Sequence, residues 1–153
     1  MIATQSAGIL LYRKRNDRVE LFLVHPGGPF WKKKDVGSWT IPKGEFTNNE
    51  KALEAAKREF EEETGIALFG DFIELTPVKQ KAGKIIYAWA LEGNVDPSAI
   101  LSNSFKIEWP PKSGQYREFP EIDKAEWFGE EEAKEKINPA QARLVDELLQ
   151  RLV

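Results

Sequence analysis

The pattern of apolar and polar residues along the chain predicts a mixture of strands and helices. Short runs rich in β-branched, aromatic and aliphatic residues are typical of strands, and they occupy residues 3–12, 19–25, 38–41, 69–80, 84–92, 102–109 and 122–128. The first two runs are predicted to pair as a hairpin. Helical patterning predicts helices at residues 47–64, 130–136 and 139–152. Residues 25–37 and 110–120 are rich in proline, glycine and lysine or serine, and we expect loops there.

Many strands with only three helices indicate an α+β protein in which helices cover a sheet. The chain has 153 residues, of which 41% are hydrophobic and 31% charged, as in ordinary globular domains. A chain of this length can bury one sizeable core. We therefore expect a single domain over residues 1–153.

Charge and composition exclude several classes of protein. The net charge of -3 argues against a general polyanion binder, so we expect no DNA duplex as a partner. The absence of cysteine excludes disulfides and cysteine-based zinc sites, and the single histidine excludes a histidine-rich metal site. The longest apolar run, residues 85–91, is too short to span a bilayer, and residue 1 opens no signal peptide. We expect no membrane partner and a cytoplasmic location.

The helix predicted at residues 47–64 has clear boundary signals. Thr47 followed three residues later by Glu50 fits a capping box at its start. Gly65 stands directly after its last turn, where a left-handed C-cap is favoured.

This helix crowds glutamates onto one turn. Glu59, Glu62 and Glu63 are spaced i, i+3, i+4, so their carboxylates lie together at the edge of the apolar face, whereas Glu61 and Lys57 are expected to face solvent. That apolar face is formed by Ala52, Leu53, Ala56 and Phe60. Like charges at this spacing repel by about 0.2–0.5 kcal/mol per pair. A solvated charged surface is one reading of the cluster. Its position at a core edge instead favours a cation, which Arg58 supplies in part and a hard divalent ion such as Mg²⁺ can complete.

The same stretch resembles the Nudix box, G-x5-E-x7-R-E-U-x-E-E-x-G-U, in which U is an aliphatic or aromatic residue. Every fixed position is filled, by Gly44, Glu50, Arg58, Glu59, Phe60, Glu62, Glu63, Gly65 and Ile66. The resemblance implies the Nudix fold, an α/β/α sandwich with a mixed β-sheet flanked by helices. It also implies a MutT-like hydrolase that cleaves nucleoside diphosphates linked to another moiety with the help of a divalent metal.

The resemblance assigns roles to the residues of the box. Glu63 corresponds to a direct metal ligand, and Glu59 and Glu62 complete the site or order water. The backbone carbonyl near Lys43 and Gly44 corresponds to a further ligand, which a Cβ at Gly44 would obstruct. The implied metal is Mg²⁺, for which Mn²⁺ can substitute.

Other positions have structural or catalytic roles in the family. Arg58 and Glu50 correspond to an ion pair that steadies the loop and helix. In some members the general base is a helix glutamate and in others a downstream loop glutamate. Here Glu121, rather than Glu118, matches the downstream position better.

Five residues outside the box are candidate substrate contacts. Trp39 and Lys43 lie in "SWTIPKGE", which resembles the segment W-x-x-P-K-G of dinucleoside polyphosphate and diphosphoinositol hydrolases, and Lys43 is a candidate phosphate contact. Trp109, with Tyr116, could stack a base. Gln141 matches a position at which MutT-like enzymes read a purine edge. Core packing is the alternative for Trp39, and packing of the proline-rich loop is the alternative for Trp109.

The resemblance implies a small-molecule nucleotide as the partner, and two substrate classes stay open. The segment at residues 38–45 favours a dinucleoside polyphosphate. Gln141 favours a nucleoside triphosphate, as does Gly83, which stands where diadenosine polyphosphatases carry a tyrosine. An RNA 5′-end pyrophosphohydrolase and a non-catalytic nucleotide-binding sensor on the Nudix fold are the alternatives. The sequence leaves the oligomeric state open.

Overall fold

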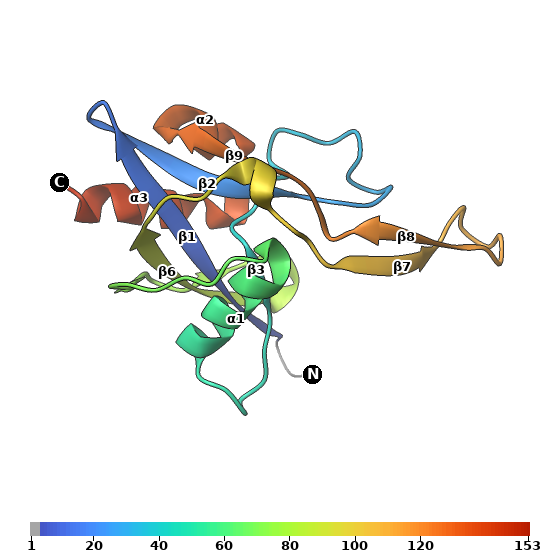
Figure 1. Ribbon diagram of the computed structural model, residues 1–153. Helices are drawn as coiled ribbons and strands as arrows, with labels where there is room; N and C mark the ends of the chain where they lie inside the picture. Colours follow the sequence, from blue (N-terminus) through green and yellow to red (C-terminus); the bar gives the residue numbers. More distant parts are fainter. Residues whose placement is uncertain (1–3) are drawn as a thin grey trace.

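The computed structural model describes residues 4–153, and Figure 1 shows its elements along the chain. The strands are β1 (Gln5–Arg15), β2 (Arg18–Pro26), β3 (Lys43–Glu45), β4 (Ile73–Glu74), β5 (Val78–Lys79), β6 (Ile85–Glu92), β7 (Ser104–Glu108), β8 (Tyr116–Pro120) and β9 (Ile122–Gly129). The helices are α1 (Ala52–Thr64), α2 (Glu130–Lys136) and α3 (Ala142–Arg151), with 3₁₀ turns η1 (Lys81–Gly83), η2 (Pro97–Ala99) and η3 (Pro139–Gln141).

The hairpin predicted at the start of the chain is present. Strands β1 and β2 pair antiparallel up to Arg15 and Arg18. Asn16 and Asp17 form the turn with φ angles of 51° and 64°. Asn and Asp tolerate this left-handed region better than most residues, and two such residues make the type of turn that matches the twist of a hairpin.

Strand β1 lies in the middle of a mixed sheet. It runs parallel to β6 and antiparallel to β2 and β3. The order across the sheet is β4-β6-β1-β2-β9, with β3 beside β1 and β5 beside β6. The predicted mixed sheet is therefore confirmed, and β3 brings Lys43 and Gly44 to the end of the central strand.

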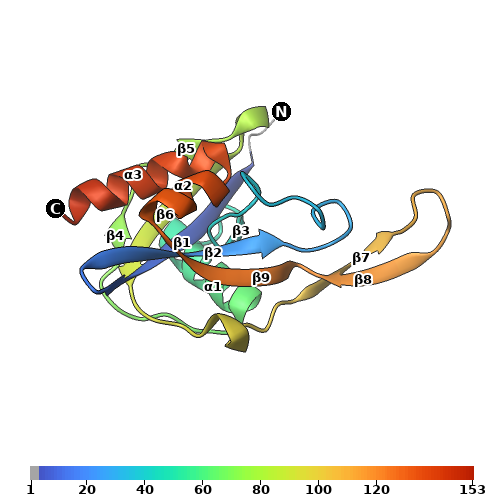
Figure 2. The ribbon, with the colours of Figure 1, turned by 90° about the horizontal axis from the view of Figure 1, so that it is seen from above.

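Helices cover both faces of this sheet (Figure 2). Alternate residues of β1 point to opposite faces. On one face Ile9 and Leu11 share a buried cluster with Phe60 of α1. On the other face Leu10 shares a cluster with Leu144 of α3. The layers are those of the α/β/α sandwich that the Nudix box implies.

The first helix begins later than predicted. It starts at Ala52 rather than at residue 47, and Lys51 occupies the N-cap position without a side-chain capping bond to residues 4–153. The capping box is wrong because the carboxylate of Glu50 accepts hydrogen bonds from Arg58 at 2.6 and 3.1 Å instead of from the backbone. The predicted C-cap is confirmed, since Gly65 has a φ angle of 81°.

The predicted loop at residues 110–120 is wrong in its second half. Strand β8 pairs with β7, and the two form a separate hairpin that projects from the body in Figures 1 and 2. Phe105 and Phe119 face each other across it, with ring centroids 6.2 Å apart. The proline, serine and glycine residues that suggested a loop form only its tip.

Two strand predictions and the expected exposure of Lys57 to solvent also differ from the structure. The strand expected at residues 38–41 is reduced to isolated bridges at Trp39 and Thr40. The strand expected at residues 69–80 is two short strands, β4 and β5, with Pro77 between them. Lys57 is half-buried, with its ammonium 5.5 Å from the centre of the Phe72 ring.

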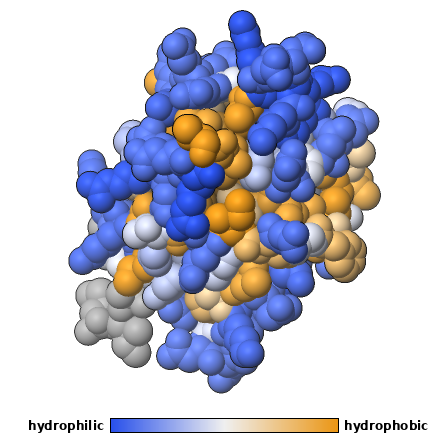
Figure 3. Space-filling view, turned by 90° about the vertical axis from the view of Figure 1, so that its left-hand side faces the viewer, coloured by the Kyte–Doolittle hydropathy of each residue, from blue (hydrophilic) through white to orange (hydrophobic). Residues whose placement is uncertain are grey.

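The surface of the described part is mixed in character. Figure 3 shows the left-hand side of Figure 1, where apolar groups lie among charged and polar side chains. Within residues 4–153, each helix is too short or too polar to cross a lipid bilayer.

Candidate active site

Glu63, in the last turn of α1, lies against the backbone of β3. Its Oε2 accepts a hydrogen bond from the Lys43 backbone N–H at 3.2 Å. Burial raises the pKa of Glu63 to about 8, although the nearby Lys43 ammonium opposes the shift. Burial also lowers the pKa of Lys43, against the opposing effect of Glu63. The site thus holds a carboxyl group and an amine whose charges are both costly in this environment.

Glu59, one turn earlier, lies against Gly44. A Cβ at Gly44 would come within 1.9 Å of the Glu59 Oε2 atom, so only glycine leaves room for this carboxylate. The Glu59 side chain is 14% exposed, and burial raises its pKa. The close approach of helix and strand therefore explains the glycine at the start of the box.

Arg58 joins the glutamates of the loop and helix. Its guanidinium donates to Glu50 at 2.6 Å, to Glu59 at 2.9 Å and to Glu62 at 3.1 Å. These bonds raise the pKa of Arg58, with the bond to Glu50 contributing most. The ion pair between Arg58 and Glu50 that the resemblance implies is present. It fixes the loop at residues 47–51 to the acidic turn.

Glu121 approaches the same edge from between β8 and β9. Its negative charge contributes to the raised pKa of both Glu59 and Glu63, as the smallest of the causes that act on them. Its backbone carbonyl accepts a hydrogen bond from the Gly27 N–H at 2.8 Å, and its own N–H donates to the Asn103 carbonyl at 2.8 Å. Glu121 is exposed, but these two hydrogen bonds fix its backbone in place.

Comparison with known proteins shows to which family the chain belongs. The NUDIX domain model matches residues 3–148. The chain belongs to the Nudix family. It is a hydrolase of the type that acts on phosphorus-containing acid anhydrides, as the complete box indicates. No curated protein matches the chain.

Solved Nudix structures have the same fold. An Ap4A hydrolase from C. elegans, in a binary complex, superposes with a TM-score of 0.65 at 21% identity over 98% of each chain. The NUDIX domain of NrtR from Shewanella oneidensis, complexed with ADP ribose, has a TM-score of 0.68 at 13% identity and covers 100% of this chain and 90% of its own. A mutT/nudix family protein from Listeria innocua has a TM-score of 0.65 at 17% identity over 99% and 95% of the two chains.

The carboxylates of the Nudix box fit a hard divalent cation in donor type. Within residues 4–153, three or more acidic or histidine side chains do not converge into a closed metal cage. Arg58 instead shares Glu59 and Glu62. An open set of this kind suits Mg²⁺, which binds through one or two carboxylates together with water and substrate phosphates. Divalent metal is typical of the family, and these residues are suited to hold it.

Trp39 lies in the interior rather than at the acidic turn. It is 3% exposed, and its indole N–H donates to Asp35 at 2.8 Å. Its ring packs edge-on against His25 and Phe128, with centroid distances of 5.3 and 4.9 Å. This placement favours the packing role over the substrate contact.

Gln141 is also buried, and its amide is bonded within the protein. Its Oε1 accepts from the Ile41 backbone N–H at 3.0 Å, and its Nε2 donates to Thr40 Oγ1 at 2.8 Å. These bonds tie η3 to the segment before β3 and leave the side chain 1% exposed. The geometry favours a structural role, while base reading stays a prediction.

Replacing Gln141 by alanine separates the two roles. Since the Ile41 N–H would lose its buried acceptor, we expect the free energy of unfolding to fall by about 1–3 kcal/mol. We expect discrimination between bases to change little. Denaturant unfolding and the ratio of kcat/KM for ATP and CTP measure the two effects, and a changed ratio at unchanged stability would assign Gln141 to base reading.

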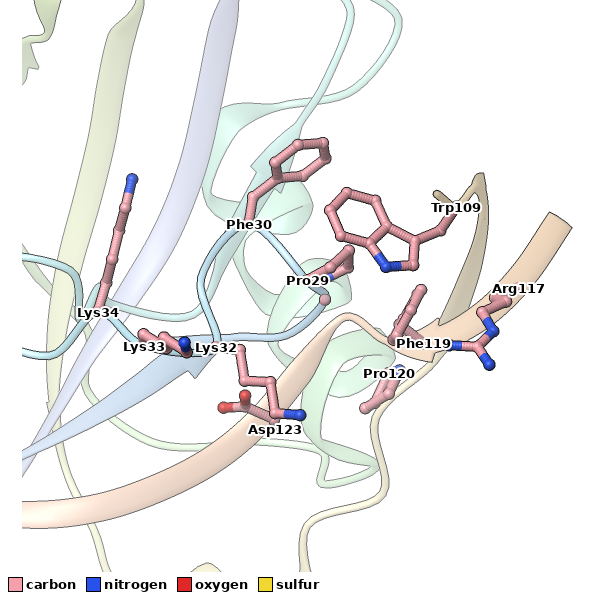
Figure 4. A pocket seen from close by; sticks show the side chains of 11 residues that line it. Pro29, Phe30, Lys32, Lys33, Lys34, Trp109, Arg117, Phe119, Pro120 and Asp123 are labelled. Atoms are coloured by element: carbon pink, nitrogen blue, oxygen red, sulfur yellow. The ribbon is translucent and has the colours of Figure 1, made fainter. Parts of the chain in front are cut away.

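Trp109 follows β7 at the tip of the β7–β8 hairpin, where its backbone N–H donates to the Gln115 carbonyl oxygen at 2.9 Å, and its ring faces the loop after β2. Its ring lies edge-to-face with Phe30, with centroids 5.5 Å apart. Both line the pocket shown in Figure 4, together with Arg117 and Phe119 of β8. The sequence does not reveal this pocket, because the composition of residues 110–120 predicts a loop where the structure has β8.

His25 is a second residue whose position was not predicted. The sequence contains one histidine, at the end of an apolar strand. From this we could exclude a histidine-rich metal site, but we could not predict a role for His25. The structure places it 1% exposed, with Nδ1 2.7 Å from Asp123 and Nε2 2.7 Å from the Lys34 carbonyl oxygen. It therefore connects β9 to the loop that carries Phe30.

Proposed function

We propose that residues 1–153 form one Nudix hydrolase domain that cleaves a phosphoanhydride bond of a small nucleotide by attack of water at phosphorus. The observation that carries this proposal is the acidic edge at which Glu63 lies against Lys43 and Glu59 lies against Gly44. Glu121 approaches from a different strand connection. A merely solvated charged helix would not require its glutamates to pack against the backbone of a strand.

The chain's own residues supply the parts that phosphoryl transfer needs. Glu63, Glu62 and Glu59 are the proposed ligands of Mg²⁺, for which Mn²⁺ can substitute, with the backbone at Lys43 and Gly44 beside them. When bound, the metal screens phosphate charge and lowers the pKa of coordinated water. The ammonium of Lys43 can contact a phosphate oxygen, which stabilises charge that water would otherwise have to solvate.

Glu121 is the proposed general base. It lies near the Glu59 and Glu63 carboxylates, and it comes from a segment that is independent of α1. A base outside the helix can hold a proton from the attacking water while the helix glutamates stay free for the metal.

The proposed partner is a nucleoside triphosphate or a dinucleoside polyphosphate, and the proposed location is the cytoplasm. The likeness to the Ap4A hydrolase supports this only through the shared fold, because its identity is 21%.

A panel of nucleoside triphosphates, dinucleoside polyphosphates and 5′-triphosphorylated RNA, assayed with Mg²⁺, tests the proposal when every product is identified. Turnover of a small nucleotide is expected. Binding without turnover would instead favour a sensor, and turnover of RNA alone would favour the RNA-end alternative.

The metal proposal predicts a thermodynamic effect. We expect Mg²⁺ or Mn²⁺ to raise the melting temperature, because a ligand that binds only the native state stabilises it. Glu62→Gln/Glu63→Gln should lose both this rise and the calorimetric heat of binding. Equal binding by the wild type and the double variant would contradict the ligand assignment.

A further inference from the structure

A pocket of about 690 Å³ lies between the loop after β2 and the β7–β8 hairpin. A volume of this size falls within the usual range of small-molecule sites. Figure 4 shows side chains from both segments around it, among them Phe30 and Lys32 from the loop and Trp109, Arg117 and Phe119 from the hairpin. The pocket is therefore made by two segments outside the Nudix box.

The first property of the pocket is aromatic surface. Phe30 is 57% exposed although it is a large apolar side chain, and it meets Trp109 at an interplanar angle of 81°. Because the two rings are nearly perpendicular, a flat ligand can stack on the face of only one of them and meets the edge of the other. An exposed aromatic face binds another flat π-system, such as a nucleobase, without regard to which base it is.

The second property is positive charge. Lys32, Lys33 and Arg117 line the pocket, against one carboxylate, that of Asp123, in the described wall. Lys34 also borders it, but its ammonium lies over the Trp31 ring, 4.9 Å from the ring centre. This local excess contrasts with the net charge of -3 of the whole chain. Asp123 is also engaged with the His25 ring at 2.7 Å, which leaves it less available to a ligand. The side chains of the wall therefore offer cations and aromatic faces, which suit an anion that carries a flat ring.

The third property is its position beside the acidic edge. Pro120 lines the pocket, and Glu121 is the next residue. The Gly27 N–H joins the loop to the Glu121 carbonyl oxygen at 2.8 Å. The pocket wall therefore continues directly into the segment that carries Glu121, and a ligand that occupies both the pocket and the acidic edge has to extend from the pocket along this segment.

The loop that forms one wall is held in place before any ligand binds. The His25 ring bridges Asp123 and the Lys34 carbonyl oxygen, each at 2.7 Å. Gly28 packs so tightly that a Cβ there would lie 2.8 Å from the Phe105 ring. A preformed wall lowers the entropy lost on binding.

We propose that this pocket binds the nucleoside end of the substrate. Its base stacks on the face of one ring of the Phe30–Trp109 pair and meets the edge of the other. Its phosphates pair with Lys32, Lys33 and Arg117. The base is bound by its face, so purines and pyrimidines are accepted alike. The inference deepens the proposed function and rests on it for the identity of the bound end as part of a substrate.

Calorimetric titrations in EDTA, at constant low salt, test the pocket without any turnover. ATP and CTP are expected to bind at least about tenfold more tightly than inorganic triphosphate, the scale of one base–aromatic stack. Phe30→Ala and Trp109→Ala should each reduce this advantage. Phe69→Ala is the control, because Phe69 is an aromatic side chain that is 82% exposed and does not line the pocket. Equal affinity for ATP and triphosphate in the wild type would overturn the proposal and leave a solvated lysine run.

Kinetics with Mg²⁺ distinguish this inference from the proposed function. Phe30→Ala and Trp109→Ala are expected to raise KM for ATP and CTP by similar factors with little change in kcat, because stacking is the same in ground and transition states. Turnover with an unchanged KM in both variants would reject the pocket and keep the hydrolase. ATP binding that these variants weaken, in a protein that turns over no nucleotide, would keep the pocket and reject the hydrolase.

Discussion

Replacing Glu63 by glutamine is expected to lower kcat by at least about a hundredfold, the scale of removing one positioned electrostatic group. Glutamine keeps the shape of the side chain and its hydrogen bond from the Lys43 N–H, but it deletes the charge that a metal requires. The loss should fall on kcat because these carboxylates act mainly on the charged transition state. Steady-state kinetics with saturating Mg²⁺ and nucleotide measure it.

The same variant is expected to be at least as stable as the wild type without metal. Burial raises the pKa of Glu63 from 4.5 to about 8, so the folded protein holds this proton more tightly than the unfolded chain does. Stability from this group is complete below about pH 4.5, falls as the pH rises toward 8, and is lost above it. Glu63→Gln removes this loss. Denaturant unfolding in EDTA measures this effect. Between pH 5 and pH 9 the free energy of unfolding should decrease less for the variant than for the wild type.

Glu61→Gln provides the internal control for both effects. Glu61 lies two residues earlier on the same helix, and it is exposed. The variant should stay near the wild type in kcat and in the pH dependence of stability. If the two variants had equal activity, the assignment of the catalytic face of α1 would be wrong.

The periodicity of the sequence was sufficient for the main elements of the fold. The β1–β2 hairpin follows from two apolar runs around Asn16 and Asp17, and the end of α1 follows from Gly65. The first residue of α1 could not be predicted from local sequence. Glu50 fits a capping box locally, but Arg58, eight residues later in the chain, competes for its carboxylate in a half-buried ion pair.

In the candidate site, too, local spacing was predictable and tertiary contacts were not. Helical spacing alone puts Glu59, Glu62 and Glu63 on one edge, so the acidic turn was predictable. The surroundings of Gln141 and Trp39 were not, because each bonds to a partner that the fold supplies. The pocket at Trp109 depends on the pairing of two strands across a loop-like tip, which composition alone suggested was irregular.

Gly44 is a residue of the box at which the structure leaves no space for a side chain. Gly44→Ala is expected to lower kcat by about a hundredfold, the scale of misplacing a catalytic group by about 1 Å. The new Cβ would lie 1.9 Å from Oε2 and 2.1 Å from Cδ of Glu59, so that carboxylate has to move. Strand β3 can keep its pairing with Ala7, because the backbone conformation of Gly44 is one that alanine can adopt.

Stability should therefore change much less than activity in Gly44→Ala. The displaced group is the end of a flexible side chain rather than backbone, and its bond to Arg58 is one of several that the guanidinium makes. Gly129→Ala is the matched control, since its φ is -66° and a Cβ there meets no described atom within 4 Å. Melting curves and kcat for both variants separate a displaced catalytic carboxylate from a damaged fold. A Gly44→Ala protein with wild-type kcat would show that the position of Glu59 against β3 does not matter to the reaction, and Glu59 would then leave the proposed set of metal ligands.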